Sequence, residues 1–334
     1  MKKNQRGNPE ERHMTLLSPD AVAPVKKDLE DTLAALDRML LGRPELHRLV
    51  LAGILARGHV LLEGLPGLGK TALIRALAQI LDLDFKRIQF TPDLMPSDIL
   101  GSHILETGAD GKREMSFKPG PVFCNLLLAD EINRASPKTQ SAMLETMQER
   151  TVTLMGVTRP LPDPFFVLAS QNPIELEGTY PLPEAQTDRF IFKLLVDPPD
   201  ASTLTAIITT RSHGDMPESG FTLRRESLAR ALETVGKILL PEAVADWIGR
   251  IVAATHGAEH VTCGASPRAA IAMAESARAL ALMDGRPSVG FDDVRKVAFP
   301  VLNHRLILDY RAKLDGISPR EIVDKVLEST PVAE

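Results

Sequence analysis

The stretch Gly64-Leu65-Pro66-Gly67-Leu68-Gly69-Lys70-Thr71 decides the fold, because it fits the phosphate-binding pattern G-x-x-x-x-G-K-[ST]. Residues 59–63 before it have the apolar pattern of a short buried strand, and residues 71–81 after it have that of a helix. Glycines let the loop approach phosphates closely, so that backbone N–H groups and the positive end of the helix face the anion. The stretch therefore predicts a nucleotide-binding site between a strand and a helix.

The last two residues of this stretch carry side chains suited to a triphosphate. Lys70 can reach the β- and γ-phosphates, and the hydroxyl of Thr71 can coordinate Mg²⁺. Ala72, next in the chain, is included among the residues predicted to contact the nucleotide. The alternative is a glycine-rich turn with a chance lysine, which the flanking strand and helix disfavour.

The composition is that of an ordinary globular protein with room for two domains. The chain has 334 residues, 44% of them hydrophobic and 25% charged. Its net charge of -5 argues against a surface that coats nucleic acid, although a basic channel in an assembled ring would not show in that sum. Cys124 and Cys263 are isolated, so neither a disulfide framework nor a C-x-x-C metal site is predicted. We expect a cytoplasmic protein without a membrane span, because no early apolar run is long enough to cross a bilayer.

Apolar patterns predict an α/β core followed by helices. Two predicted helices, 29–41 and 44–56, are joined by a turn at Gly42, and its place resembles that at which P-loop ATPases often bring backbone close to the base. Four more strands are expected after the first, at 85–90, 126–130, 165–170 and 190–196. Strands that alternate with helices indicate a parallel sheet covered on both faces. From about residue 222 only helices are predicted, at 226–235, 242–256, 267–283, 291–299 and 319–327.

These patterns divide the chain into three parts. Residues 1–25 are polar and broken by prolines, which predicts a flexible tail. Residues 26–210 form the predicted αβα core, and residues 222–334 form a smaller all-α lid domain. Two hairpins are predicted as inserts in the core, near 97–120 and 151–160. Either hairpin could instead cap the sheet.

A second motif, Leu126-Leu127-Leu128-Ala129-Asp130-Glu131, ends an apolar strand in two carboxylates. Asp130 is predicted to hold Mg²⁺, directly or through water, and Glu131 to orient and polarise the attacking water. An Asp-Glu pair also occurs by chance at a solvated sheet edge, but the upstream loop favours the catalytic interpretation. Ser136 and Pro137 then predict a helix start, and Arg134 before them is either a solvated charge or a contact to a neighbouring subunit.

Four segments together resemble the MoxR family of AAA+ ATPases, namely 64–71, 126–140, 169–175 and 182–190. They follow the family's order, and the resemblance extends from about residue 42 to the end of the chain. It implies a P-loop AAA+ module, with a parallel sheet sandwiched by helices and a smaller all-α lid domain after it. It also implies ATP and Mg²⁺ as cofactors and a homo-hexameric ring that remodels, matures or activates partner proteins, with a von Willebrand factor A domain protein as a partner.

The resemblance implies roles for three polar residues outside the two motifs. Asn172 matches the sensor-1 residue, which reports the γ-phosphate and helps to position the lytic water. Arg189 matches the arginine finger, which reaches into the site of the adjacent subunit. Arg268 matches the sensor-2 arginine of the lid and would link the nucleotide state to the lid angle.

The residues themselves support these roles unequally. Asn172 follows a strand predicted to run parallel to that of Asp130, so its amide can reach the same sheet edge, although a plain turn asparagine would show the same pattern. Arg189 could simply pair with Asp188, and only an oligomer gives it a catalytic role. Arg268 lies in the first turn of a helix, where the dipole disfavours a cation, so either a phosphate or a surface ion pair would be its partner.

The two hairpins resemble inserts of the clade that contains MoxR proteins, magnesium-chelatase ATPase subunits and MCM-type helicases. In that clade the inserts face the ring pore or partner proteins. One departure lies at Gly42-Arg43, where many family members have Gly-Gln, so a detailed base contact there is not carried over. The residues predicted for hydrolysis are all present.

Three other functions would use the same phosphate-binding loop. A magnesium-chelatase-like motor would need a porphyrin-handling partner, which this chain cannot reveal. A nucleic-acid translocase would need a basic pore, which Lys112, Arg113 and Lys118 support only weakly. A small-molecule kinase leaves Asn172, Arg189 and Arg268 without a role. The sequence therefore favours an ATP hydrolase that acts on partner proteins, with the client unidentified.

Overall fold

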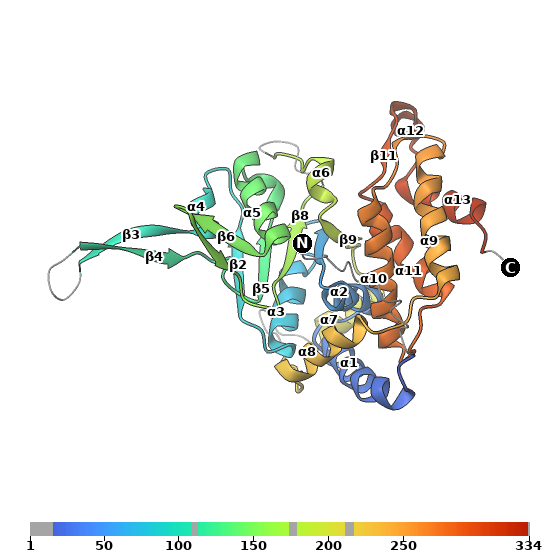
Figure 1. The fold of residues 1–334 in the computed structure, drawn as a ribbon, viewed down its shortest axis with the longest axis horizontal. Helices are drawn as coiled ribbons and strands as arrows, with labels where there is room; N and C mark the ends of the chain where they lie inside the picture. The colour runs from blue at the N-terminus through green and yellow to red at the C-terminus, as the bar shows by residue number, and fades with distance from the viewer. Residues whose placement is uncertain (1–15, 108–112, 174–178, 211–216, 333–334) are drawn as a thin grey trace, which may run out of the picture.

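The centre of the molecule is a five-stranded parallel sheet with the order β2-β5-β8-β1-β9. In chain order the strands are β1 (His59–Glu63), β2 (Phe85–Gln89), β5 (Leu126–Asp130), β8 (Phe166–Gln171) and β9 (Phe190–Leu195). The computed structural model describes residues 16–107, 113–173, 179–210 and 217–332. Helices cover both faces of the sheet (Figure 1).

Strand β5 shows why the sheet is covered on both faces. All five of its residues are buried, as expected for a strand inside a parallel sheet. Leu126 and Leu128 pack in the hydrophobic cluster that contains α1, α2 and α3. Leu127 and Ala129 pack in the other cluster, together with Met143 of α5. The predicted fold class, a parallel sheet between helices with a helical lid after it, is confirmed.

The first helix is longer than expected and corrects the predicted tail. Helix α1 spans Pro19–Met39, so residues 19–25 are helical, and residues 1–15 lie outside the described part. Pro19 stands at the start of the helix, where its missing N–H costs nothing. Val22 and Val25 are buried on the same face as Leu29, and this packing holds the first turns in place despite Pro24.

The remaining helices of the core position the site. They are α2 (Pro44–Leu55), α3 (Lys70–Ile80), α4 (Pro96–Leu100), α5 (Pro137–Glu149), α6 (Glu184–Thr187) and α7 (Ala201–Thr210). Helix α5 begins as predicted, because the side chain of Ser136 accepts a hydrogen bond from the N–H of Thr139 and Pro137 follows it. Helix α7 lies at the end of the predicted core and was not among the helices predicted from the sequence.

The lid contains the predicted helices, α8 (Arg225–Val235), α9 (Glu242–Ala254), α10 (Pro267–Met283), α11 (Phe291–Leu302) and α13 (Pro319–Ser329). Helix α11 was expected to end at Phe299 but continues through Pro300, because Val301 and Leu302 are fully buried. A short helix, α12 (Tyr310–Asp315), and a two-stranded sheet of β10 (Val261–Cys263) and β11 (Ile307–Leu308) were not predicted. The lid shares a continuous hydrophobic cluster with α1 and α2, so the two domains are packed together.

Both predicted hairpins are present as separate two-stranded sheets. Strands β3 (Gly101–Thr107) and β4 (Arg113–Pro119) pair along seven residues and project far from the body (Figure 1). Strands β6 (Thr151–Leu154) and β7 (Val157–Pro160) form the shorter hairpin. The long hairpin therefore does not simply cap the sheet. Lys112, which was weighed for nucleic-acid binding, lies outside the described residues.

Candidate functional site

The phosphate-binding loop leads from the end of β1 into α3. Gly67 and Gly69 have φ angles of 78° and 82°, a region that side chains other than glycine rarely adopt. Gly69 caps α3, so the free N–H groups of the first helical turn point into the loop. This backbone geometry fits the anion site that the motif predicts.

Lys70 lies inside this loop with its ammonium group turned toward backbone carbonyls. Its Nζ donates a hydrogen bond to the carbonyl of Gly64 and lies 3.4 Å from the carbonyl of Gln171. Burial lowers the pKa of Lys70, while Asp130, Glu131 and Glu63 act in the opposite direction. The carbonyl contacts hold the ammonium group at the carboxyl ends of β1 and β8, where phosphates would lie.

The predicted polar residues meet at one cavity. Its volume is about 370 Å³, and the loop, both carboxylates of the second motif and the sensor-1 candidate line it. The lining residues are Pro66, Gly67, Gly69, Lys70, Thr71, Ala72, Arg87, Gln89, Asp130, Glu131, Ser170 and Asn172. Strand β8 pairs in parallel with both β5 and β1, and this brings Asn172 to the same sheet edge as Asp130 and the loop. We name this edge, defined by residues 64–72, 130–131 and 172, the phosphate edge.

Asp130 and Thr71 are the candidate Mg²⁺ ligands, and their geometry fits that role. The hydroxyl of Thr71 lies 3.4 Å from Oδ2 of Asp130. Ser170 donates to the other oxygen, Oδ1, at 2.5 Å and so fixes the orientation of the carboxylate. One buried carboxylate beside a hydroxyl is a donor set that suits Mg²⁺, which keeps several waters and phosphate oxygens as further ligands.

Glu131 stands in a left-handed conformation with φ 55° at the end of β5. Its N–H donates to the hydroxyl of Ser170 at 2.9 Å, so Ser170 connects both acidic residues. Its carboxylate accepts from Gln89 at 2.7 Å and from Arg134 at 3.1 Å. The backbone conformation and these contacts hold the carboxylate at the cavity. Arg134, whose role was left open, therefore contacts Glu131 of its own chain.

Sequence reasoning missed Arg87, Gln89 and Ser170. Arg87 donates to Oδ2 of Asp130 from Nη2 at 2.7 Å and from Nε at 3.1 Å. Gln89 and Asp130 are paired in the register of β2 and β5. The sequence pattern that could have identified Arg87 and Gln89 is their spacing of two residues in β2, which places both side chains on the same face of the strand.

A larger cavity of about 820 Å³ adjoins the loop and is mostly apolar, with Leu41, Leu46, Leu204 and Ile207 in its wall. It has the position expected for a nucleotide base. Gly42 has φ 86° and packs against the side chain of Thr203, so a larger residue has no room there. Gly42 is absent from the lining of this cavity, although its neighbours Leu41 and Arg43 belong to it.

Arg43 ties the loop to the end of β9. Its guanidinium donates to the carbonyl of Leu68 and, at 2.8 Å, to that of Asp197. Burial lowers the pKa of Arg43, and Asp197 partly offsets this. Arg43 thus has a structural contact with the phosphate-binding loop at the position where the sequence departs from the family pattern.

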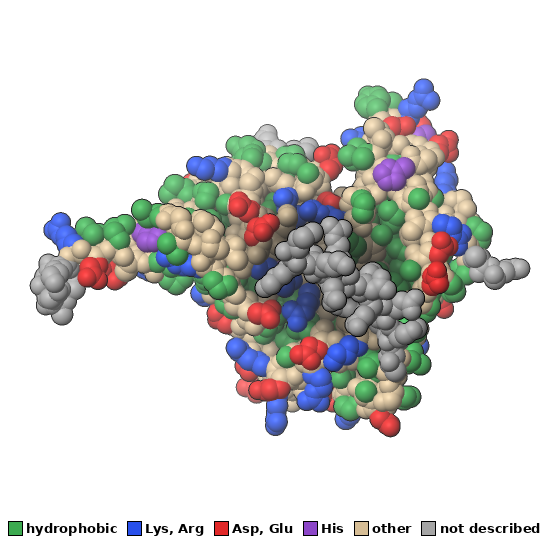
Figure 2. Space-filling model, in the orientation of Figure 1, with side chains coloured by type: hydrophobic (Ala, Val, Ile, Leu, Met, Phe, Trp, Pro, Cys, Tyr) green, Lys and Arg blue, Asp and Glu red, His purple; other side chains and the backbone are tan. Residues whose placement is uncertain are grey.

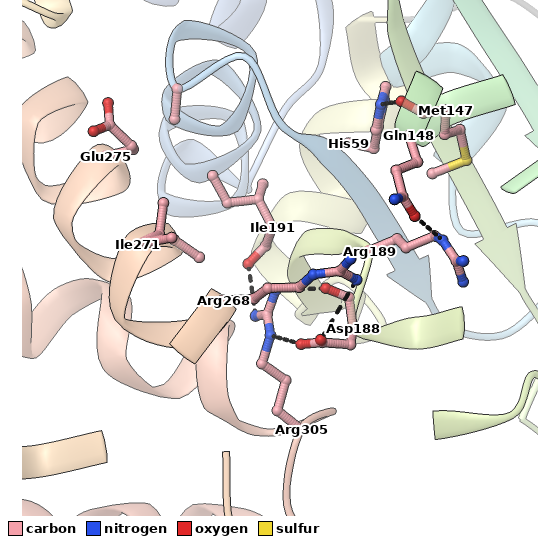
Figure 3. Close-up of a pocket in the computed structure, with 12 residues that line it drawn as sticks. His59, Met147, Gln148, Asp188, Arg189, Ile191, Arg268, Ile271, Glu275 and Arg305 are labelled. Atoms are coloured by element: carbon pink, nitrogen blue, oxygen red, sulfur yellow. Dashed lines mark hydrogen bonds and ion pairs between the residues drawn. The ribbon is translucent and has the colours of Figure 1, made fainter. Parts of the chain in front are cut away.

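Arg189 and Arg268 lie together at a different cavity, of about 280 Å³ (Figure 3). Arg189 donates to Oε1 of Gln148 at 3.0 Å and to the carbonyl of Ala185 at 3.0 Å. Arg268, half exposed, lies 3.8 Å from the carboxylate of Asp188. The same carboxylate accepts from the buried Arg305 at 2.8 Å. We name this region, defined by residues 188, 189, 268 and 305, the arginine edge.

The two edges lie at opposite ends of the sheet. His59 at the start of β1 is paired with Phe190, which directly follows Arg189, whereas the phosphate-binding loop follows the other end of β1. A strand of five residues separates its ends by ~13 Å at about 3.3 Å per residue. The structure therefore does not bring Arg268 to the phosphates of its own chain. The predicted link between the nucleotide state and the lid angle through Arg268 stays a prediction. In this structure the start of α10, where Arg268 lies, packs at Asp188.

The fold and the phosphate edge define a P-loop ATPase of the AAA class. A family model described as "ATPase family associated with various cellular activities (AAA)" matches residues 59–192, and one described as "AAA lid domain" matches residues 253–326. A crystal structure of a candidate ATPase from Cytophaga hutchinsonii has a TM-score of 0.86 and 38% sequence identity, covering 94% of this chain and 98% of that one.

Within that class, the chain belongs to the MoxR family of AAA+ ATPases. It is 43% identical over 315 residues to Chaperone MoxR1 of Mycobacterium tuberculosis, covering 92% of this chain and 82% of the relative. It is 32% identical over 333 residues to Protein MoxR of Paracoccus denitrificans, covering 90% and 95%. The predicted family is confirmed. Among the described residues, no helix is long and apolar enough to cross a membrane.

Proposed function

We propose that this chain is a Mg²⁺-dependent ATPase that hydrolyses ATP to ADP and phosphate as a homo-hexameric ring. The observation that supports this most is the separation of the two edges. The phosphate edge has a lysine and two carboxylates, while Arg189 and Arg268 lie at the other end of the strands. A ring gives both edges a role, because the arginine edge of one subunit meets the phosphate edge of the next.

Each residue then has a defined task. Lys70 binds the β- and γ-phosphates, Glu131 polarises the attacking water, and Asn172 positions it. Thr71 and Asp130 would hold Mg²⁺, which supplies charge neutralisation at the phosphate oxygens when bound. Arg189 of the adjacent subunit stabilises the charge that develops in the transition state.

Arg268 is assigned to the same shared site as Arg189. Both side chains line one cavity, and both lie beside Asp188 in space or in the chain. We therefore place the sensor role of Arg268 across the subunit interface, as a contact that a neighbour receives. In this assignment a phosphate of the neighbour's nucleotide would be a further anionic partner for Arg268, besides Asp188.

The work that hydrolysis drives is proposed to be the remodelling, maturation or activation of partner proteins in the cytoplasm, together with a von Willebrand factor A domain protein. The relative named Chaperone MoxR1 supports this class of work. A nucleic-acid translocase is less well supported, because Arg113 and Lys118 on the long hairpin are accompanied by Glu106 and Glu114. Figure 2 shows basic, acidic and hydrophobic side chains together on this projection.

Mixing experiments test the shared site. Arg189→Ala and Lys70→Ala should each be inactive alone, because each removes one half of every site. In a randomly mixed ring, about one quarter of the interfaces pair an intact loop with an intact arginine, so ATPase activity should reappear at that level. Size-exclusion chromatography confirms that rings form. Absence of activity in mixed rings would contradict a shared site.

A second mixture distinguishes the two possible roles of Arg268. If Arg268 acts across the interface, rings of Arg189→Ala and Arg268→Ala subunits stay impaired, because no neighbour offers both arginines. If Arg268 acts within its own subunit, these rings recover activity, because Arg189→Ala subunits keep Arg268 and receive Arg189 from the neighbour. Recovery would therefore assign Arg268 to the site of its own subunit while leaving the shared role of Arg189 intact.

A further inference from the structure

Arg87 engages the carboxylate oxygen that faces the other candidate Mg²⁺ ligand. Oδ2 of Asp130 lies 3.4 Å from the hydroxyl of Thr71 and accepts two hydrogen bonds from Arg87, at 2.7 and 3.1 Å. The other oxygen, Oδ1, is held by Ser170. The guanidinium of Arg87 thus neutralises Asp130 at the position where a divalent cation would bind.

Arg87 and a divalent cation cannot share this oxygen. Two positive charges a few ångströms apart repel each other, and the repulsion is strong where Asp130 is buried. A guanidinium donates hydrogen bonds but has no lone pair to coordinate a metal. Direct binding of Mg²⁺ to Oδ2 of Asp130 therefore requires Arg87 to leave that oxygen.

The cavity provides a second partner for Arg87. Its side chain is 40% exposed and lines both the 370 Å³ phosphate cavity and the adjoining 820 Å³ cavity. Among the described residues outside 64–73, no other one lines both cavities. A guanidinium binds phosphate oxygens with two parallel hydrogen bonds, which a lysine cannot do.

We propose that Arg87 exchanges partners when the Mg²⁺ complex of a nucleoside triphosphate binds. Without nucleotide, Arg87 holds Asp130 and keeps its carboxylate neutralised. With nucleotide, Arg87 releases Asp130 and binds a phosphate oxygen as a further phosphate-binding residue beside Lys70. This inference rests on the proposed nucleotide site.

The exchange also reaches Glu131. Arg87 donates to Oε1 of Gln89 at 2.7 Å, and Gln89 donates to Glu131 at 2.7 Å. When Arg87 moves, Gln89 loses the contact that orients its amide, so the hold on Glu131 weakens at the same step. Binding of the metal–nucleotide complex is thereby coupled to the position of the catalytic carboxylate.

Equilibrium binding of a fluorescent ATP analogue to the full chain, titrated with Mg²⁺, tests the exchange. Arg87→Gln removes the competing charge, so the Mg²⁺ concentration for half-maximal binding should decrease. The variant also loses a charge-assisted phosphate contact, so its affinity at saturating Mg²⁺ should fall about tenfold. Arg87→Lys keeps the charge without the two parallel donors and should give intermediate values for both quantities.

Lys86→Gln is the matched control, because it removes one charge from the next residue of β2, whose side chain contacts the carbonyl of Phe123 instead. It should bind nucleotide and Mg²⁺ as the wild type does. Thermal unfolding of each variant establishes that it is folded. If Arg87→Gln does not fold, the Mg²⁺ midpoint of Arg87→Lys is used in its place. An unchanged Mg²⁺ midpoint in the folded Arg87 variants would overturn the exchange. A wild-type chain that binds no ATP would instead contradict the proposed function itself.

Discussion

The phosphate edge and the arginine edge both contain charged side chains, but these side chains have different kinds of hydrogen-bond partner. At the phosphate edge, Asp130 and Glu131 surround a cavity, and their hydrogen bonds come from groups that a ligand can replace, such as Arg87 and Gln89. At the arginine edge, Arg305 is 3% exposed and donates to Asp188 and to four backbone carbonyls, those of Asp188, Phe190, Ile191 and Val301.

This difference teaches which polar clusters are available for chemistry. A fully satisfied buried network holds one arrangement, whereas a network around a cavity can exchange partners without leaving buried groups unpaired. The phosphate edge therefore fits catalysis. The interior of the arginine edge fits a rigid joint, from which Arg189 and the half-exposed Arg268 are presented outward.

The largest expected effect is at the phosphate edge. Glu131→Gln removes the carboxylate that we propose polarises the attacking water but keeps a similar shape, so turnover should fall about 100- to 10,000-fold while ATP still binds. Steady-state hydrolysis and equilibrium ATP binding measure the two quantities. Glu145→Gln, the same change at an exposed position on α5, is the control. Normal turnover of Glu131→Gln would remove Glu131 from its role and leave the catalytic base unassigned.

The sequence predicted the phosphate edge well, because its parts are local in the chain. The loop, the strand that ends at Asp130 and the strand before Asn172 each carry their own pattern of glycine or apolar residues. Parallel pairing then brings strand ends to one edge without further information. Arg87 was missed because its role depends on the register in which Gln89 stands opposite Asp130.

The arginine edge was predicted less well, because it depends on how distant segments pack. Asp188 and Arg305 are 117 residues apart, and no local pattern connects them. The position of Arg268 follows from the packing of the lid, since Ser266 at the start of α10 donates to Asp188 at 3.1 Å. The start of α1 was also mispredicted, because it depends on the packing of Val22 and Val25 in the hydrophobic cluster shared by the lid and the core.

Arg305→Met is predicted to have the next largest effect, on stability. It leaves Asp188 and several buried carbonyls without their donor, and breaking a buried ion pair costs about 3–5 kcal/mol. The free energy of unfolding in denaturant measures the loss. Lys27→Met makes a comparable change in the exposed pair of Lys27 and Asp31 and should cost less than about 1 kcal/mol. Equal losses in both variants would show that the buried contacts of Arg305 contribute no more to the free energy of unfolding than an exposed ion pair does.

His59, at the start of β1 beside the arginine edge, predicts a pH dependence of stability. Its Nε2 donates to the carbonyl of Met147 at 3.0 Å (Figure 3), and its Nδ1 accepts from the N–H of Val167 at 3.0 Å. The ring is therefore neutral, and burial lowers its pKa to about 4 from 6.5. Because the unfolded chain binds the proton more tightly, the stability that His59 contributes is present above pH 6.5 and lost as the pH falls toward 4.

The expected size is about 2 kcal/mol between pH 7 and pH 5, smaller than the effect of Arg305→Met. Denaturant unfolding at the two pH values gives the difference, which should shrink by that amount in His59→Asn. His47, which is buried, and His304, which is half-buried, also have lowered pKa values and titrate in both proteins, so the comparison isolates His59. If His59→Asn loses as much free energy of unfolding between pH 7 and pH 5 as the wild type does, protonation of His59 is not the cause of the loss. Other buried groups at that end of the sheet must then account for it.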